Sequence, residues 1–503
     1  MKSNLYLAAS AVVGLAQSAS VGTTGNTCCT ELANAGLGDK IVYPGQELYQ
    51  ERQESYWSVS AALSSECYAL PQSIEDVSTI MKVISMHSCE FGIRGGGHGS
   101  FALSNAIKCG VTIDMGYFNQ TTYDEERNLA LIQPGGHWQD VYDTLSPFGV
   151  TVAGGRAGTV GVGGFNTGGG ISFHAASHGF SCDNVANYEI VLADGTIANA
   201  NHSHNADLFQ AMKGGSGNFA IITRIDMYPI AFEDKSNPVI WGGNLVYAQT
   251  EGDSVIDALV TFTENIPKDE NSSSIVYWAY VPAAGGTIVN AAIENTKAEI
   301  KPAAFDAYYA INVTADTTEV NKMSAVTKAL GSGQPSGFRN VWFTSTWEND
   351  ADIMKYAVKK FNALNEELES LMPSDESGLN TLAMFQPVSL SAVEKGIGGN
   401  VMGLERYDSS GILFLLTWAA NGEENEEAAF PLLKAFMEDV EAYAKELGVL
   451  REWKFLNYAH LEQDALSTVG EEAIGKLQGA SQKYDPNGVF QNLRKSGFKI
   501  PSY

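Results

Sequence analysis

The sequence predicts an α+β protein of two domains, in which a glycine-rich first domain precedes an antiparallel sheet covered by helices. Short apolar runs alternate with helical patterns and glycine-rich turns over residues 55–233. Near residue 233 the glycine content falls, and strand-like runs then alternate with long amphipathic segments up to about residue 450. The 503 residues are 44% apolar and 18% charged, which is typical of chains that bury a large core and excludes general disorder.

The first domain is expected to span residues 21–233 and to be rich in tight turns. Its strand-like runs lie at residues 91–93, 111–113, 129–132, 188–192 and 220–225. Apolar spacing of three and four predicts helices at residues 74–86 and 138–145. Asp194-Gly195 is a hairpin signal, so we expect the strand before it to pair with the one after it.

The second domain is expected to span residues 234–450, with the last segment, residues 451–503, returning to the first domain. Two amphipathic helices are expected at about residues 350–371 and 425–447. Strands are expected at residues 239–246, 275–281, 288–293, 341–347 and 412–418. The last segment is expected to contain an aromatic strand, a helix near residues 465–483 and a Pro-Asn-Gly turn at 486–488.

The N-terminus has the pattern of a secretory signal peptide. Lys2 precedes about ten apolar residues and a stretch of small residues, and the apolar run is too short to span a membrane. The alternative is a buried N-terminal helix. We expect residues 1–20 to be removed and the protein to be secreted, and four N-x-S/T sequons at Asn119, Asn201, Asn271 and Asn312 agree with a glycoprotein.

The six cysteines all lie in the first 182 residues, and secretion makes them disulfide candidates. Six cysteines allow many pairings. We expect Cys28 or Cys29 to reach Cys67, and Cys89 to pair with Cys109. No metal site is expected, because no CxxC spacing occurs.

The chain is strongly acidic, with a formal net charge of −27. Nucleic acids and anionic membranes both require basic protein surface, so neither is an expected partner. We expect a monomer that acts on a small molecule.

Three glycine-rich clusters lie in the first domain, at residues 94–100, 154–170 and 213–219. Glycines in the first cluster would let backbone N–H groups converge on a diphosphate, although a tight structural turn is the alternative. The cluster is neither a G-x-G-x-x-G fingerprint nor a Walker loop. Three such clusters in one domain favour a large dinucleotide, and His98 inside the first cluster is placed to touch it.

These clusters carry a family resemblance. Residues 93–98, 134–138, 160–170, 182–185, 191–195, 207–209 and 214–219 resemble the FAD-binding domain of the vanillyl-alcohol oxidase/p-cresol methylhydroxylase (PCMH) flavoproteins. Residues 457–459 and 484–491 resemble the fungal berberine bridge enzyme-like branch. The resemblance implies a two-domain PCMH-type fold with FAD as the cofactor.

The resemblance also implies where the flavin is held. FAD would be attached through its 8-methyl group to His98, and the second link of many members is not expected because Ala157 stands where their cysteine would be. Val160 matches a position linked to oxygen access, and valine there favours an oxidase. The residues placed at the cofactor are Arg94, Gly95, Gly96, Gly97, His98, Gly99, Ser100, Val160, Gly161, Gly163, Gly164, Asn218, Ile222 and Asn457.

The catalytic base is the point at which this sequence departs from the family. Berberine bridge-type members have a carboxylate before the tryptophan of a substrate-domain strand, but residues 413–417 before Trp418 contain none. Tyr458 is the best remaining candidate, with an aromatic wall as its alternative role. Gln386 and Trp418 are the expected substrate contacts.

The histidines outside the first glycine cluster are weaker candidates for function. His174 and His178 are weaker candidates for the base, as is Gln386. His137 replaces a residue that is usually small, and no role follows from the sequence. His202 and His204 are expected to be solvated.

The sequence therefore predicts a secreted FAD-dependent oxidase that takes hydride from an alcohol, carbohydrate or secondary metabolite and reduces O2 to H2O2. One alternative is an oxidative cyclase or desaturase, and another is a flavin-retaining protein without redox activity. Serine hydrolysis is disfavoured because there is no G-x-S-x-G motif, and the acidic pairs at 423–427 look like solvated surface rather than a glycosidase site.

Overall fold

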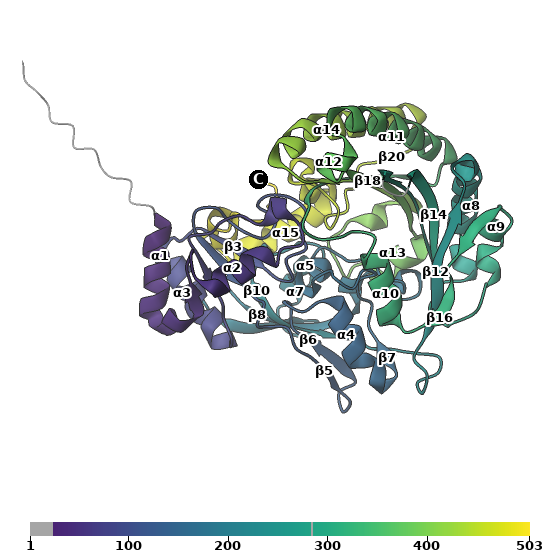
Figure 1. The fold of residues 1–503 in the computed structure, drawn as a ribbon. Helices are drawn as coiled ribbons and strands as arrows, with labels where there is room; N and C mark the ends of the chain where they lie inside the picture. The colour runs from purple at the N-terminus through teal and green to yellow at the C-terminus, as the bar shows by residue number, and fades with distance from the viewer. Residues whose placement is uncertain (1–23, 283–284, 503) are drawn as a thin grey trace, which may run out of the picture.

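The computed structural model describes residues 24–282 and 285–502, and it has two parts that lie side by side (Figure 1). The predicted signal peptide, residues 1–20, lies outside the described residues. In one part the purple and blue elements of the N-terminal half surround the yellow C-terminal segment. In the other, a large curved sheet carries helices on its outer side.

The first part contains three sheets. A four-stranded sheet has the order β1-β2-β4-β3, in which β4 runs parallel to β2 and β3. An antiparallel sheet has the order β5-β6-β10-β8-β9, and β7 pairs with β11. The strands are β1 (Ile41–Val42), β2 (Cys67–Ala69), β3 (Phe91–Arg94), β4 (Val111–Asp114), β5 (Thr121–Asp124), β6 (Leu129–Ile132), β7 (Val150–Thr151), β8 (Val185–Val191), β9 (Ile197–Asn201), β10 (Ile221–Met227) and β11 (Ile230–Ala231). The β8–β9 hairpin forms at the predicted Asp194-Gly195 turn.

Seven helices accompany these sheets within the described residues. They are α1 (Thr24–Leu32), α2 (Glu47–Glu54), α3 (Ile74–His87), α4 (Trp138–Leu145), α5 (Val162–Thr167), α6 (Ala175–His178) and α7 (Ala206–Met212). Helix α3 forms at the predicted residues, and its first turn has a recognisable sequence pattern. Ser73 accepts a hydrogen bond from the Asp76 N–H and the Asp76 carboxylate accepts one from the Ser73 N–H, so the helix begins with a capping box.

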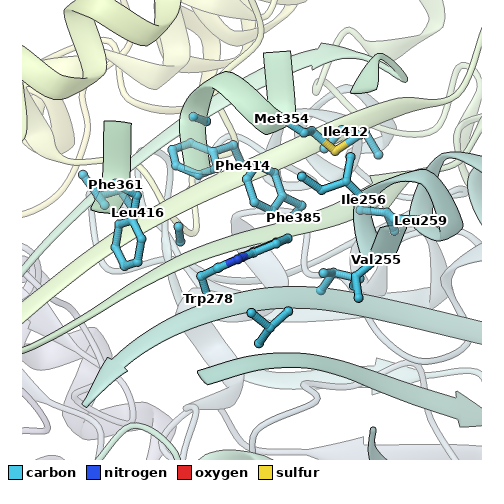
Figure 2. Close-up of a cluster of buried hydrophobic side chains, with 14 of the residues drawn as sticks. Val255, Ile256, Leu259, Trp278, Met354, Phe361, Phe385, Ile412, Phe414 and Leu416 are labelled. Carbon is cyan, nitrogen blue, oxygen red and sulfur yellow. The ribbon is translucent and has the colours of Figure 1, made fainter. Parts of the chain in front are cut away.

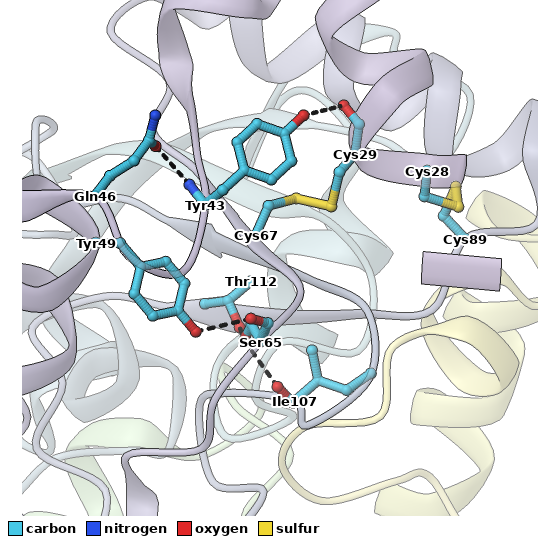
Figure 3. The surroundings of a disulfide bond; sticks show 10 residues. All are labelled: Cys28, Cys29, Tyr43, Gln46, Tyr49, Ser65, Cys67, Cys89, Ile107 and Thr112. Carbon is cyan, nitrogen blue, oxygen red and sulfur yellow. Dashed lines mark hydrogen bonds between the residues drawn. A yellow bond between two sulfur atoms is a disulfide. The ribbon is translucent and has the colours of Figure 1, made fainter. Parts of the chain in front are cut away.

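Two disulfides hold α1 against this part of the protein (Figure 3). Cys29 pairs with Cys67, as one of the two predicted options has it, and Cys28 pairs with Cys89. Successive helical side chains point about 100° apart, so the two adjacent cysteines reach different elements. The predicted Cys89–Cys109 disulfide is wrong, because Cys89 is bonded to Cys28 and Cys109 is an exposed free thiol.

The second part is built on one antiparallel sheet, for which nine strands are described. Its order is β15-β12-β14-β13-β18-β19-β17-β20, with β16 also paired to β12. The strands are β12 (Ile240–Tyr247), β13 (Ser272–Val281), β14 (Gly286–Asn295), β15 (Val313–Asp316), β16 (Glu319–Asn321), β17 (Arg339–Glu348), β18 (Asn380–Val388), β19 (Gly411–Ala420) and β20 (Leu450–Arg451). Strand β18, which contains Pro387 near its end, was not among the predicted strands.

Helices cover one face of this sheet and form the main core with it. They include α11 and α14, both within a few residues of their predicted bounds. The helices of this part are α8 (Gly252–Asn265), α9 (Asp306–Tyr309), α10 (Met323–Gly331), α11 (Ala351–Leu371), α12 (Ser374–Ser377), α13 (Leu390–Gly396) and α14 (Glu423–Leu447). Figure 2 shows Phe385, Phe414 and Leu416 of the sheet packed with Met354 and Phe361 of α11. The predicted α+β class and the helix-covered antiparallel sheet are confirmed.

The C-terminal segment returns to the first part, where α15 (Glu471–Tyr484) packs near α7 (Figure 1). Lys483 forms a 2.7 Å ion pair with Asp207 of α7. Phe490 packs edge-on against Phe91 of β3, and the Asp485 carboxylate accepts bonds from the backbone N–H groups of residues 489 and 490. The end of the chain is thereby brought beside the loop that follows β3.

In the described ranges, no helix combines the length and the apolar character that a bilayer crossing would need. The domain boundaries at residues 233 and 450 stay a prediction.

Candidate FAD and substrate site

The first glycine cluster leaves the end of β3 and carries His98 into a cavity of about 400 Å³. The His98 ring is stacked on the Trp57 indole, with ring centroids 4.3 Å apart and planes 10° from parallel. Its Nε2 lies 3.3 Å from the Thr159 hydroxyl oxygen of the second cluster. Burial lowers the pKa of His98 to about 4, so the imidazole is neutral at physiological pH.

The first and second glycine clusters meet backbone to backbone. A Cβ added to Gly96 would lie 2.5 Å from the Gly161 Cα, so only glycine fits on this line of contact. His137 supports the same contact, because its Nε2 lies 3.1 Å from the Gly96 carbonyl oxygen. This gives a position, though not a chemical role, to the histidine that the sequence left without one.

The third cluster and the C-terminal segment build one end of the cavity around Arg494. Its Nη2 donates to the Asn218 side-chain oxygen at 2.7 Å and to the Phe498 carbonyl at 2.6 Å, and its Nε has no partner. Burial lowers the pKa of this arginine to about 9. Among the described residues no carboxylate lies within ion-pair distance of it, so a buried cation lines the cavity without a countercharge.

The residues present fit an FAD molecule. The Ser104 hydroxyl and the Asn105 side-chain oxygen also line the cavity and lack hydrogen-bond partners. Buried polar atoms are rarely left unpaired, so these groups indicate a polar ligand. An anionic diphosphate would supply the negative countercharge that Arg494 lacks. The glycine backbone, which has no side chains in the way, would let a flat isoalloxazine ring approach closely.

The C-terminal Asn457-Tyr458 pair closes the cavity from the other side. Asn457 donates through Nδ2 to the carbonyls of Gly164 and Phe165 and accepts from the Gly170 N–H, so it fixes the second cluster. The Tyr458 hydroxyl lies 3.2 Å from Arg156 Nη2, and the same nitrogen donates to the Gln386 side-chain oxygen at 2.5 Å.

The opposite wall is formed by the uncovered face of the nine-stranded sheet. Its side chains are almost entirely apolar or aromatic. They are Ile275, Tyr277, Ala292, Trp342, Leu382, Met384 and Leu415. A ligand held between the glycine clusters would therefore meet an apolar chamber with one polar corner at Arg156.

The structure brings most of the predicted residues to this cavity. The ones that line it are Gly95, Gly96, Gly97, His98, Gly99, Ser100, Val160, Gly161, Gly163, Gly164, Ile222, Asn457 and Tyr458. Ala157, at the position of the absent second-link cysteine, lines it as well. Gln386 does not line the cavity but reaches it through Arg156.

Three of the predicted contacts lie elsewhere. The Arg94 guanidinium turns to Asp114 and Ser55, where it packs on Tyr56, because its side chain leaves β3 on the side away from the cavity. Asn218 lies behind the wall, bonded to Arg494. Trp418 faces the helices in the main core, since residues alternate along β19, and this corrects its expected role as a substrate contact.

The other histidines and Cys182 stay outside the cavity lining. Burial lowers the pKa of His174 to about 3, and its Nε2 has no partner. His178, His202 and His204 are exposed. The buried Cys182 thiol contacts Asp183 and cannot serve as a second flavin ligand from there.

Sequence reasoning missed two charged residues near the polar corner, Arg156 and Glu294. Glu294 of β14 is fully buried. Its Oε2 accepts from Ser273 at 2.8 Å, and Oε1 has no partner. Burial raises its pKa to about 7, while the Arg156 charge pulls the pKa back down. Both residues could have been found, because each is the one charged side chain in an otherwise glycine-rich or apolar run.

Comparison with known proteins shows the family to which this chain is related. A model described as an FAD binding domain matches residues 65–201. The chain is 37% identical to the FAD-dependent monooxygenase sdcF of Emericella nidulans, over 95% of this chain and 99% of that one. It is 30% identical to the bifunctional solanapyrone synthase of Alternaria solani, over 92% of this chain and 86% of that one.

A solved structure agrees on the fold. The glucooligosaccharide oxidase of Acremonium strictum, which carries a 6-S-cysteinyl, 8α-N1-histidyl FAD, aligns with a TM-score of 0.74 at 17% identity and covers 96% of this chain and all of its own. The two-domain PCMH-type fold is thereby confirmed. The FAD binding domain model and the relative named an FAD-dependent monooxygenase confirm an FAD-dependent oxidoreductase. The chain belongs to the FAD-linked oxidoreductases of the vanillyl-alcohol oxidase/p-cresol methylhydroxylase type, in the fungal berberine bridge enzyme-like branch.

Proposed function

We propose that this protein is a secreted FAD-dependent oxidase whose flavin is attached through His98 alone. It takes hydride from a small, largely apolar secondary metabolite and passes both electrons to O2, which leaves as H2O2. Bound FAD would supply the hydride acceptor and the route to oxygen.

The setting of His98 is the observation that carries the proposal. A nitrogen must be uncharged to form a bond to the flavin, and burial keeps this imidazole neutral. Trp57 on one side and Thr159 near Nε2 fix the plane of the ring at the cavity surface. Because Ala157 has no nucleophile and the Cys182 thiol is buried elsewhere, a single link is expected.

The attachment is tested on a denaturing gel. Wild-type protein should give a band that fluoresces under ultraviolet light after acid treatment, and His98→Ala should give none. His202→Ala, which changes an exposed histidine, is the matched control and should keep the band. Release of all yellow colour when the wild type is denatured would rule out the link to His98, and a spectrum of the doubly linked type would contradict the single link.

The polar corner supports an oxidation that begins with loss of a hydroxyl proton. Tyr458 lines the cavity and is the candidate to take that proton, and the Arg156 cation 3.2 Å from its hydroxyl would stabilise negative charge as it develops there. The sheet wall beside it is largely apolar, and apolar surroundings strengthen such an interaction.

Turnover is tested by H2O2 release with a panel of aromatic alcohols, hydroxy fatty acids and oligosaccharides. We expect the aromatic compounds to be turned over and the oligosaccharides to be poor substrates, because the sheet wall has few hydrogen-bonding groups. No turnover of any compound in the panel, together with slow reoxidation of chemically reduced flavin by O2, would contradict the oxidase and favour a flavin-retaining protein without redox activity.

A second candidate function is oxidative cyclisation or desaturation in a biosynthetic pathway, since one relative is named a bifunctional synthase. The relative named a monooxygenase suggests that oxygen transfer should be measured too. Product analysis under heavy-isotope oxygen identifies oxygen transfer, because a monooxygenase puts one labelled atom in the product and the other in water, whereas an oxidase, cyclase or desaturase leaves both in H2O2. The structure of the unlabelled product then separates cyclisation or desaturation from simple oxidation.

A further inference from the structure

Arg156 places a positive charge in a cavity that is otherwise apolar on the substrate side. The residue is half-buried and lines the cavity between the second glycine cluster and the sheet. Its two recorded hydrogen bonds, to Gln386 and Tyr458, both come from Nη2. A guanidinium carries five N–H donors, so Nε and Nη1 retain donors for a ligand.

The protein does not neutralise this charge directly. Across residues 24–282 and 285–502, no carboxylate lies within ion-pair distance of Arg156. Gln386, which is 1% exposed, pins the guanidinium with its oxygen, and its Nε2 has no partner. The free N–H donors of Arg156 and the side-chain amide NH2 of Gln386 therefore lie close together without acceptors. Donors left without hydrogen-bond partners next to apolar surface cost free energy.

The Arg156 charge lowers the pKa of the buried Glu294 carboxyl, but Glu294 is a weak countercharge. It lies on the same face of the sheet as Ala292, and its carboxylate is already bonded to Ser273. Its burial favours the protonated form. The corner therefore keeps a net positive charge whenever Glu294 is protonated.

We propose that Arg156 binds an acidic oxygen of the substrate in its anionic form, so that the substrate is an otherwise apolar molecule with a phenolic, enolic or carboxylic oxygen at this corner. Nε and Nη1 would hold the oxygen, while Gln386 and Tyr458 fix the plane of the guanidinium. This inference rests on the proposed function and narrows its substrate class.

Binding of 4-nitrophenol to the flavin-loaded protein tests the inference without turnover. This probe is yellow only as its phenolate, so difference spectra report which form is bound, and calorimetry gives the affinity. The wild type should bind the phenolate. Arg156→Gln should weaken its binding about tenfold to a hundredfold, since hydrogen bonds to charged groups contribute that much, and should abolish the preference for the anion. Arg156→Lys should restore part of both effects.

Three controls make the outcome specific. Arg127→Gln, which removes an exposed arginine outside the cavity, should leave binding unchanged. The neutral ether 4-nitroanisole should bind wild type and Arg156→Gln with similar affinity. Binding of 4-nitrobenzoate in place of 4-nitrophenol would support the acidic oxygen and identify it as a carboxylate.

Equal affinities of the wild type for 4-nitrophenol and 4-nitroanisole would overturn the inference, as would failure of both acidic probes to bind. That comparison uses only wild-type protein, so it holds even if Arg156→Gln does not fold. The result is also independent of oxidase activity. Absence of H2O2 with phenolate binding intact would contradict the proposed function alone.

Discussion

The two walls of the cavity differ in the atoms that they present to a ligand, because one presents backbone and the other presents side chains. The glycine wall, formed by residues 95–100 with Gly161, Gly163 and Gly164, presents mainly backbone, and its two segments touch at Gly96 and Gly161. The sheet wall, the uncovered face of the nine-stranded sheet, presents side chains such as Met384 and Leu415. Backbone fits a large cofactor that many sequences share, whereas side chains fit one small molecule. Cofactor recognition is therefore visible in composition, and substrate recognition is not.

The sheet wall has a second contrast within each strand. Along β19, Phe414 and Trp418 point into the helix-covered core, and Leu415 between them points to the cavity. The core face buries aromatic rings, as with Phe414 stacked on Trp347 at 4.9 Å. One face holds the fold together, and the other can vary with the substrate.

The largest expected effect is on the free energy of unfolding, and it differs between the core face and the cavity face of β19. Phe414→Ala should destabilise the protein by about 3–5 kcal/mol, because it leaves a void among rings that cannot collapse. Its neighbour Leu415→Ala should lose less than about 2 kcal/mol, because its side chain already borders the cavity. Urea unfolding of both variants measures the difference, and equal losses would show that the sheet wall is as structural as the core.

The next effect concerns Glu294, a buried carboxyl on the sheet wall. The pKa of Glu294 is about 7 in the folded protein and 4.5 is its ordinary value, so between these values the folded state holds the extra proton. Stability should therefore fall as pH rises from about 4.5 to 7, by about 3 kcal/mol for this group. The groups that face it are Ser273, Tyr277 and Arg156.

Glu294→Gln keeps an acceptor for Ser273 and removes the charge, so the variant should lack this part of the pH dependence. The measurement is the difference in unfolding free energy between variant and wild type across that pH range, in which the histidine contributions cancel. Glu427→Gln on the exposed side of α14 is the matched control and should track the wild type. A constant difference between Glu294→Gln and wild type would place the carboxyl in a solvated setting.

The contrast between the glycine wall and the sheet wall also explains how much of the structure the sequence could predict. Helix α11 follows from the regular spacing of its apolar residues, and strand β19 follows from a short continuous apolar run. His98 and the glycine wall follow from composition together with the family resemblance. The face to which Trp418 points does not follow, because a period of two leaves the choice of face open. Pairing of Cys28 with Cys89 depends on how distant segments pack, which local patterns do not encode.

Arg156 shows the same limit at the site itself. The sequence shows that it lies within a glycine cluster, but its role depends on Gln386 and Tyr458, which lie 230 and 302 residues away in the chain. Polar corners assembled from such distant residues become visible only in the folded protein.

The smallest expected effect tests whether the glycine wall is as rigid as its contacts indicate. The backbone at Gly161 has φ −74°, which alanine adopts without strain, so a substitution there acts only through its Cβ. That atom would lie 2.6 Å from the Gly96 Cα. Gly161→Ala should therefore destabilise the protein by about 1–3 kcal/mol and reduce covalent flavin by moving the loop that carries His98.

The matched control is Gly475→Ala, since Gly475 lies inside α15 with no atom within 4 Å of the added Cβ. This change should stabilise the protein by about 0.5–1 kcal/mol, because alanine favours the helix. Thermal unfolding and the fluorescence of the flavin band report both variants. If Gly161→Ala kept wild-type stability and full flavin incorporation, the two glycine clusters could separate freely, and the backbone wall would be no more demanding than the sheet wall it faces.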